Sequence, residues 1–165
     1  MPPVDAVVET FIGNYDNILS RKTPVIYTIG YEGRTLEDFI QTLKEHHINV
    51  VIDVRELPLS RKKGFSKTAL SNALEKNDIA YIHMKSLGTP KELRDKFKSK
   101  KITFKEFALK YEEYLNTHPE ALEKLLQCAL MNTCVLMCYE RDWKICHRRI
   151  IAEHMKMAKF EVIHI

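Results

Sequence analysis

Short apolar runs alternate with longer amphipathic stretches along most of the chain. Five of these runs are rich in β-branched and other apolar side chains and are bounded by turn-forming or polar residues, a pattern typical of buried strands. They cover residues 25–29, 50–54, 80–83, 133–138 and 160–164. The sequence therefore predicts five short strands.

Helical spacing of apolar residues marks most of the segments between these runs. Thr35, with Asp38 three residues later, is typical of a helix start, and that helix is expected to end near residue 46. Ser66 is expected to cap the next helix. A long connection follows, with a lysine-rich helical stretch and further helices that start at Thr103 and Pro119. The last helix is predicted over residues 148–159.

Strands separated by helices predict an α/β fold in which a mostly parallel five-stranded sheet has helices on both faces, as in Rossmann-like proteins. Two short connections, one long one and a final short one favour the strand order 3-2-1-4-5. Strands 1 and 4 are neighbours in this order, and ligands of such sheets bind at the carboxyl ends of the strands. We therefore expect residues 30–33 to face residues 138–146 across a crevice.

The segment before the first strand carries a one-sided apolar stripe over residues 5–21, which predicts an extra helix. We assign residues 1–23 to an N-terminal helical extension and residues 24–165 to a single α/β domain. A chain of 165 residues, 45% of them hydrophobic, can form one well-buried core but is short for two domains.

Charge and hydropathy narrow the choice of partners only slightly. The net charge of +4 permits an anionic small molecule or a nucleic acid as partner without requiring either. No apolar run approaches the length of a membrane span, and the N-terminus lacks a secretion pattern, so we expect a cytoplasmic protein without membrane contact. Cofactor and oligomeric state stay open.

The most reactive chemistry is concentrated between residues 138 and 149, where two cysteines, two carboxylates, a histidine and four cations occur in twelve residues. Cys138 ends a predicted strand, and Cys146 precedes a predicted helix. The segment between them is therefore a candidate active-site loop. The remaining cysteines, Cys128 and Cys134, are expected to be reduced core residues.

Cys146 is the stronger candidate nucleophile, because a helix start and neighbouring cations favour a thiolate. His147 or Glu140 could move protons during an attack. Cys138 is the second candidate thiol, and a reversible disulfide between Cys138 and Cys146 is geometrically possible. The candidate substrate-binding residues are Tyr31, Asp53, Arg55 and Arg148. Arg55 is expected to pair with Glu140 or with a bound anion.

Three interpretations of this cluster remain open. The first is an enzyme that uses the cysteine, arginine and glutamate side chains on an anionic substrate, such as a nucleotide, a nucleic acid or a sulfur- or phosphate-containing compound. The second is a non-catalytic module that binds nucleic acid or phosphate through Arg55, Arg148, Arg149 and the Lys62-Lys63 loop, with structural cysteines. In the purely structural case, Cys146 packs at the end of the sheet and the arginines pair with Glu140, Asp142 and Asp53 in a buried polar network. The third is metal binding by Cys138, Cys146, His147 and His83, but the spacing lacks a Cys-x-x-Cys knuckle, so we predict no metal site.

Three short motifs carry a resemblance to a known family. They are Thr28-Ile29-Gly30, Asp53-Val54-Arg55, and Cys138-x-Glu140 followed after five residues by Cys146-His147-Arg148. With these motifs the sequence resembles the prokaryotic family called domain of unknown function 488 (DUF488) over about residues 25–165. The resemblance implies a compact α/β domain with two characteristic cysteines, here Cys138 and Cys146, and it implies no reaction.

A weaker similarity is to rhodaneses, which also have an Asp-Val-Arg triplet at a strand end and a nucleophilic cysteine after a strand. The present sequence departs from them in the loop that follows the cysteine. No glycine or serine occurs between Cys138 and Cys146 to form an anion cradle of backbone amides.

Overall fold

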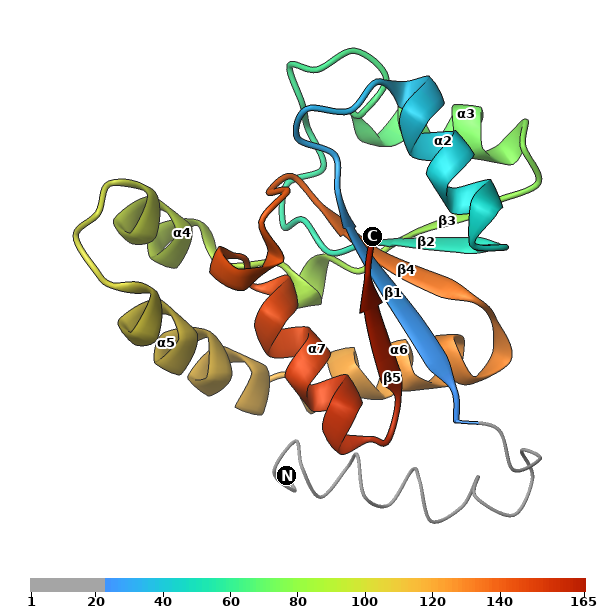
Figure 1. Cartoon of the computed structure of the whole chain (residues 1–165). Helices are drawn as coiled ribbons and strands as arrows, with labels where there is room; N and C mark the ends of the chain where they lie inside the picture. The colour runs from blue at the N-terminus through green and yellow to red at the C-terminus, as the bar shows by residue number, and fades with distance from the viewer. Residues whose placement is uncertain (1–22) are drawn as a thin grey trace.

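The computed structural model describes residues 23–165, which form a five-stranded parallel sheet between two layers of helices (Figure 1). This arrangement confirms the predicted α/β class with helices on both faces. The predicted helix over residues 5–21 lies outside the described residues. The strands are β1 (Val25–Gly30), β2 (Val50–Asp53), β3 (Ala80–His83), β4 (Cys134–Cys138) and β5 (Glu161–His164).

Helices pack on the two faces of the sheet in separate layers, each with its own apolar core. One face carries α2 (Leu36–Glu45) and α3 (Lys67–Glu75), and the other carries α5 (Phe104–Asn116), α6 (Pro119–Met131) and α7 (Arg148–Met157), with α4 (Lys91–Lys98) at its margin. Single turns of 3-10 helix, η1 (Lys85–Leu87) and η2 (Trp143–Ile145), complete the elements.

Two helix starts depend on threonine caps that the sequence indicated. The Thr35 hydroxyl accepts a hydrogen bond from the amide of Asp38, so α2 begins where its capping pattern predicts. Thr103 and Glu106 form a complete capping box at the start of α5. These caps satisfy amide groups that the first helical turn leaves without partners.

The strand order corrects the sequence-based prediction. The sheet runs β3-β2-β4-β1-β5, not 3-2-1-4-5, because β4 lies between β2 and β1. The residue pattern explains this position. Each residue of β4 is buried, which suits a central strand, whereas β5 begins at the exposed Glu161 and ends at the half-buried His164, as an edge strand can. The predicted pairing of strands 1 and 4 is confirmed.

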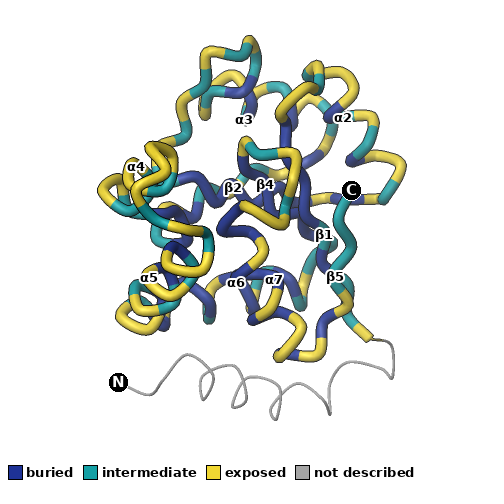
Figure 2. Tube along the Cα trace, turned by 60° about the vertical axis from the view of Figure 1, so that its left-hand side comes forward, coloured by how far each residue is buried: buried dark blue, intermediate teal, exposed yellow. Residues whose placement is uncertain are grey.

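Burial is concentrated in the middle of the sheet. Figure 2 shows β1, β2 and β4 as mostly buried and much of α4 and α5 as exposed. Between residues 23 and 165, no helix combines the length and the apolar character that a membrane crossing requires.

Candidate functional site

The candidate site lies at the carboxyl ends of β1, β2 and β4. Gly30 pairs with Cys138 in the sheet. The segment after β1 continues beside the segment after β4, because the amide of Tyr31 donates to the Cys138 carbonyl at 3.1 Å. A Cβ atom at Gly30 would lie 1.9 Å from the Glu140 carbonyl oxygen. Only glycine therefore allows this close approach, which brings residues 30–33 against the candidate loop as expected.

Cys138 and Cys146 form a buried pair of free thiols at this position. Their Sγ atoms are 2.8 Å apart, and the two residues are only 1% and 3% exposed. The Glu140 carboxyl oxygen Oε2 lies 3.3 Å from the Cys138 sulfur and 3.5 Å from the Cys146 sulfur. The loop therefore folds back and places two thiols and one carboxyl group in mutual contact.

His147 completes the cluster, and its hydrogen bonds define which ring nitrogen carries the proton. Nε2 lies 2.8 Å from the Val54 carbonyl oxygen, and Nδ1 lies 3.6 Å from the Cys146 sulfur. A carbonyl oxygen can only accept a hydrogen bond, so Nε2 must be protonated. Nδ1 of the neutral ring is then free to accept the proton of the Cys146 thiol.

The surroundings shift the pKa values of the two thiols in opposite directions. Burial opposes ionisation of Cys146, but the hydrogen bond from Cys138 and the positive charges of His147 and Arg148 lower the pKa of Cys146 well below its ordinary value. Burial, and then the hydrogen bond and negative charge of Cys146, raise the pKa of Cys138. Cys146 is therefore the more acidic thiol of the pair, and Cys138 is the weaker acid.

Arg148 supplies a fixed positive charge beside the thiol pair. It is 1% exposed, and its guanidinium donates to the Thr28 hydroxyl at 3.2 Å and to the Glu140 carbonyl oxygen. Burial works against the charge, but interactions with the neighbouring Cys138 and Cys146 raise the pKa of Arg148 overall. Its Nε has no hydrogen-bond partner among the described residues. Arg148 therefore holds the loop backbone and stabilises a thiolate.

The other predicted residues form a second cluster next to the thiols. The Arg55 guanidinium makes two hydrogen bonds with the Asp53 carboxylate, at 2.9 and 2.7 Å, and donates to the Tyr31 hydroxyl at 3.1 Å and the Phe65 carbonyl at 2.8 Å. The Tyr81 hydroxyl also donates to Asp53, at 2.5 Å. The carboxylate partner of Arg55 is therefore Asp53 and not the expected Glu140. Arg55 is buried and bound by internal partners.

Two arginines that the sequence analysis did not select, Arg34 and Arg141, lie on the two loops that meet beside the site. The Arg34 side chain donates to the Gly30 carbonyl at 3.1 Å, and an Arg141 guanidinium nitrogen would lie 3.5 Å from a Cβ atom at Gly33. Burial, followed by the charges of Arg141 and Arg148, lowers the pKa of Arg34. The cations therefore repel one another. The sequence could have indicated Arg34 and Arg141, because both arginines lie in the two loops that were expected to meet.

A metal ion would find its ligands among Cys138, Cys146 and His147, whose ligand atoms lie within 4.8 Å of one another. Two sulfurs and one nitrogen suit zinc, which also requires tetrahedral geometry with Zn–S bonds of about 2.3 Å. Such bonds place two sulfurs about 3.8 Å apart, whereas these sulfurs are 2.8 Å apart. His83 is not part of the group, because its Nε2 bonds to the Arg55 carbonyl at 2.7 Å. The geometry therefore fits a thiol pair better than a zinc site.

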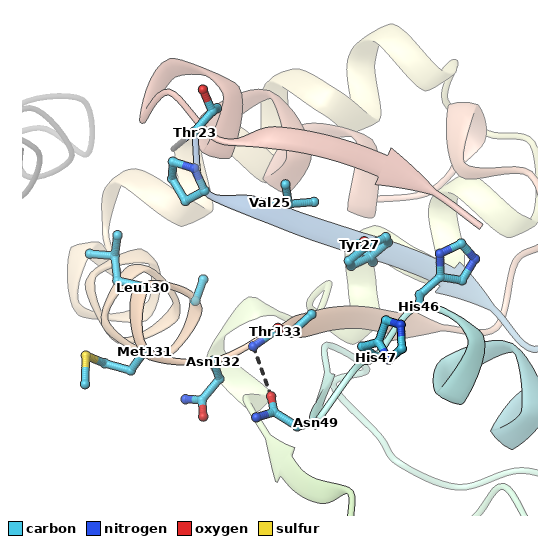
Figure 3. A pocket seen from close by; sticks show the side chains of 12 residues that line it. Thr23, Val25, Tyr27, His46, His47, Asn49, Leu130, Met131, Asn132 and Thr133 are labelled. Carbon is cyan, nitrogen blue, oxygen red and sulfur yellow. Dashed lines mark hydrogen bonds between the residues drawn. The ribbon is translucent and has the colours of Figure 1, made fainter. Parts of the chain in front are cut away.

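A separate hollow of about 550 Å³ lies at the opposite, amino ends of the strands (Figure 3). Tyr27, His46, His47 and Asn49 line it together with residues 129–133. None of the predicted site residues lies in its wall. The candidate site therefore remains the cluster at the carboxyl ends.

Comparison with known proteins identifies the family. The model of the family described as Domain of unknown function DUF488 matches residues 35–155, a span that contains β2, β3, β4 and most of the candidate site. No curated protein and no solved structure matches the chain, and the similarity to rhodaneses gains no support from these comparisons. The matched span covers well over half of the sequence, so the chain belongs to the DUF488 family.

Proposed function

We propose that the protein is an enzyme that uses Cys146 as a nucleophile on a small anionic substrate. The observation that carries this proposal is the position of the Cys146 sulfur, 2.8 Å from the Cys138 sulfur and 3.6 Å from His147 Nδ1. A thiol with an adjacent, oriented proton acceptor is the arrangement that activates cysteine nucleophiles. Core packing alone requires neither the oriented histidine nor the buried arginine.

The proposed reaction begins with transfer of the Cys146 proton to His147 Nδ1. The thiolate then attacks an electrophilic sulfur, carbonyl or phosphorus centre, and a covalent intermediate forms on Cys146. Burial raises the pKa of Glu140 and so favours its protonated form, which can donate a proton to the leaving group. Arg148 stabilises the negative charge on the sulfur before the attack.

The cations on the two loops beside the site support an anionic substrate. Arg34 and Arg141 come from the two loops that meet beside the site, and the charges of Arg141 and Arg148 both act on Arg34. An anion bound between Arg34 and Arg141 would relieve their mutual repulsion. Asp53 and Tyr31 hold the Arg55 side chain in place. In this proposal, these three residues form the wall of the site next to the bound anion.

The alternative is a module that binds nucleic acid or phosphate and in which the cysteines are only structural. Internal hydrogen bonds of Arg55 and Arg148 favour the enzyme, because a phosphate-binding module needs guanidinium groups that are free to reach a ligand. Nucleic-acid binding with a steep salt dependence, unchanged by Cys146→Ala, would favour the module.

The enzyme proposal can be tested by alkylation with iodoacetate, an anion, and with iodoacetamide, a neutral reagent of nearly the same size. Trypsin releases Cys146 in the peptide 145–148, whereas the other three cysteines share the peptide 125–141. We expect Cys146 to react before the fully buried Cys134. We also expect a higher iodoacetate-to-iodoacetamide rate ratio for Cys146 than for free cysteine.

The matched variants are Arg141→Ala and Arg149→Ala. Both side chains are exposed, but Arg141 lies next to Gly33 beside the site, whereas Arg149 pairs with Glu153 at 3.6 Å. Arg141→Ala should lower the rate ratio and Arg149→Ala should leave it unchanged. An inert Cys146, or a rate ratio equal to that of free cysteine, would overturn the proposal.

A further inference from the structure

A second thiol pair lies at the other end of β4. Cys128, in the last turn of α6, and Cys134, the first residue of β4, have their Sγ atoms 3.7 Å apart. Asn132, in the turn that joins these elements, directs its side-chain amide toward the Cys128 sulfur at 3.9 Å. Cys134 is fully buried, as predicted, but Cys128 is only half-buried, so it is not the core residue that the sequence suggested.

Cys128 forms part of the wall of a hollow of about 580 Å³ between η1 and α6. The exposed side chains of Lys85 and Lys124 lie in the same wall, together with His83 and Gln127. No carboxylate is among the described residues that line the hollow. The half-buried thiol therefore faces a positively charged space that an anionic reagent can enter.

The neighbours of Cys128 favour its ionisation. Hydrogen bonding from the Cys134 thiol outweighs burial and lowers the pKa of Cys128 to about 7. The same hydrogen bond, together with burial, raises the pKa of Cys134. Near neutral pH the half-buried Cys128 is therefore the better nucleophile, and the buried Cys134 keeps its proton.

We propose that Cys128 exchanges with anionic low-molecular-weight disulfides and that Cys134 is the resolving thiol. The Cys128 thiolate attacks one sulfur of the small disulfide, whose S–S bond breaks, and the leaving thiolate takes a proton from water. A mixed disulfide remains on Cys128. Cys134 then passes its proton to water and attacks the Cys128 sulfur, so the mixed S–S bond breaks and the second small thiolate leaves and takes a proton from water. Two protein thiols are thus oxidised to one disulfide, and one small disulfide is reduced to two thiols.

The geometry of the turn indicates which residue moves. The Thr133 amide donates to the Asn49 side-chain oxygen at 3.0 Å (Figure 3), and the Asn49 amide donates to the Thr133 carbonyl at 3.0 Å. These bonds hold the start of β4, and with it Cys134. A disulfide needs an S–S distance of about 2.05 Å, so the terminal turn of α6 must bring Cys128 closer.

This pair acts independently of Cys138 and Cys146. Cys134 and Cys138 are four residues apart on β4, which corresponds to about 13 Å of strand. The two pairs therefore cannot exchange disulfides directly. Tryptic peptides also separate them, because a Cys128–Cys134 disulfide closes a loop within peptide 125–141, whereas a Cys138–Cys146 disulfide joins peptides 125–141 and 145–148.

The test uses the reduced full-length protein with oxidised glutathione, which is anionic, and cystamine, which is dicationic. Peptide mapping of the wild-type protein after treatment with oxidised glutathione should show the internal Cys128–Cys134 disulfide. In Cys134→Ser, glutathione should instead accumulate on Cys128 as a mixed disulfide. In Cys128→Ser, Cys134 should stay reduced, and this result covers the case in which Cys134→Ser fails to fold.

Charge variants test the preference for an anion. The double variant Lys85→Ala/Lys124→Ala should slow the reaction with oxidised glutathione roughly fivefold and should not slow the reaction with cystamine. Lys110→Ala, an exposed lysine on α5, should change neither rate. Absence of the internal disulfide in the wild-type protein, oxidation of Cys134 in Cys128→Ser, or equal slowing of both reagents would overturn the proposal.

Discussion

Nε2 of His147 lies 2.8 Å from the carbonyl oxygen of Val54, and this contact determines which ring nitrogen faces Cys146. The contact depends on the observed strand order. Because β4 adjoins β2, the amide of Val54 also bonds to the Met137 carbonyl at 3.1 Å, and the end of β2 reaches the start of α7. The backbone of one strand thus fixes the tautomer of a histidine that follows another strand.

Glu140→Gln should change the pH dependence of stability. Burial raises the pKa of Glu140 in the folded protein, so the folded state binds more protons than the unfolded state as pH rises from about 4.3. The wild-type protein therefore loses stability between the unfolded-state pKa and the raised folded-state pKa. The glutamine variant lacks this loss.

Urea unfolding at a series of pH values measures the effect. The free energy of unfolding of Glu140→Gln minus that of the wild type should increase as pH rises above about 4.3 and become constant above the raised folded-state pKa. A difference that does not vary with pH would show that Glu140 has an ordinary pKa in the folded protein.

Gly30→Ala should destabilise the loop that carries the thiols. The added methyl group would lie 1.9 Å from the Glu140 carbonyl oxygen, so the loop must move, at a cost of about 1–3 kcal/mol or more. Gly33→Ala is the control. Gly33 has a φ of +74° but its nearest neighbour would be a flexible arginine at 3.5 Å, so that variant should cost only about 1 kcal/mol. Chemical denaturation of both variants measures the two stability costs. Equal costs would contradict the close approach of Gly30 to the Glu140 carbonyl.

Arg55→Leu should be costly because it leaves the Asp53 carboxylate buried without its cation. Removal of one partner from a buried ion pair typically costs about 3–5 kcal/mol. In the double variant Asp53→Asn/Arg55→Leu the unpaired charge is absent, so the double variant should be more stable than Arg55→Leu alone. A double-mutant cycle measures the coupling, and simple additivity of the two single costs would exclude the observed pair.

The secondary structure could be predicted from local patterns, because caps and apolar spacing act over a few residues. Strand 80–83 and the helix start at Thr103 are confirmed at the predicted positions. The strand order was wrong because the length of a connection shows that the chain must return past β2 but not on which side of β1 it stops. The polar ends of β5, Glu161 and His164, were the signal that β5 suits an edge.

Within the site, the meeting of Cys138 and Cys146 followed from their places at a strand end and a helix start. The specific prediction for Arg55 named Glu140 or a bound anion, and Asp53 appeared only among the arginine partners of the purely structural interpretation. Residues 53 and 55 are two apart at the end of an extended strand and therefore project to the same side, so Asp53 was the nearest carboxylate. Val54 as the acceptor for His147 could not be predicted, because that contact depends on the strand order.

The pH dependence of Cys146 alkylation tests the central claim most directly. Iodoacetamide reacts with the thiolate, so the modification rate of peptide 145–148 rises as pH passes through the pKa of the thiol. In the wild-type protein that rise should occur below the pKa of free cysteine, since His147 and Arg148 lower the pKa of Cys146. His147→Gln removes the proton acceptor and should move the rise to higher pH, with a rate at pH 7 about tenfold lower for each unit of pKa. A wild-type profile that matches free cysteine, or a His147→Gln profile identical to the wild type, would contradict the account.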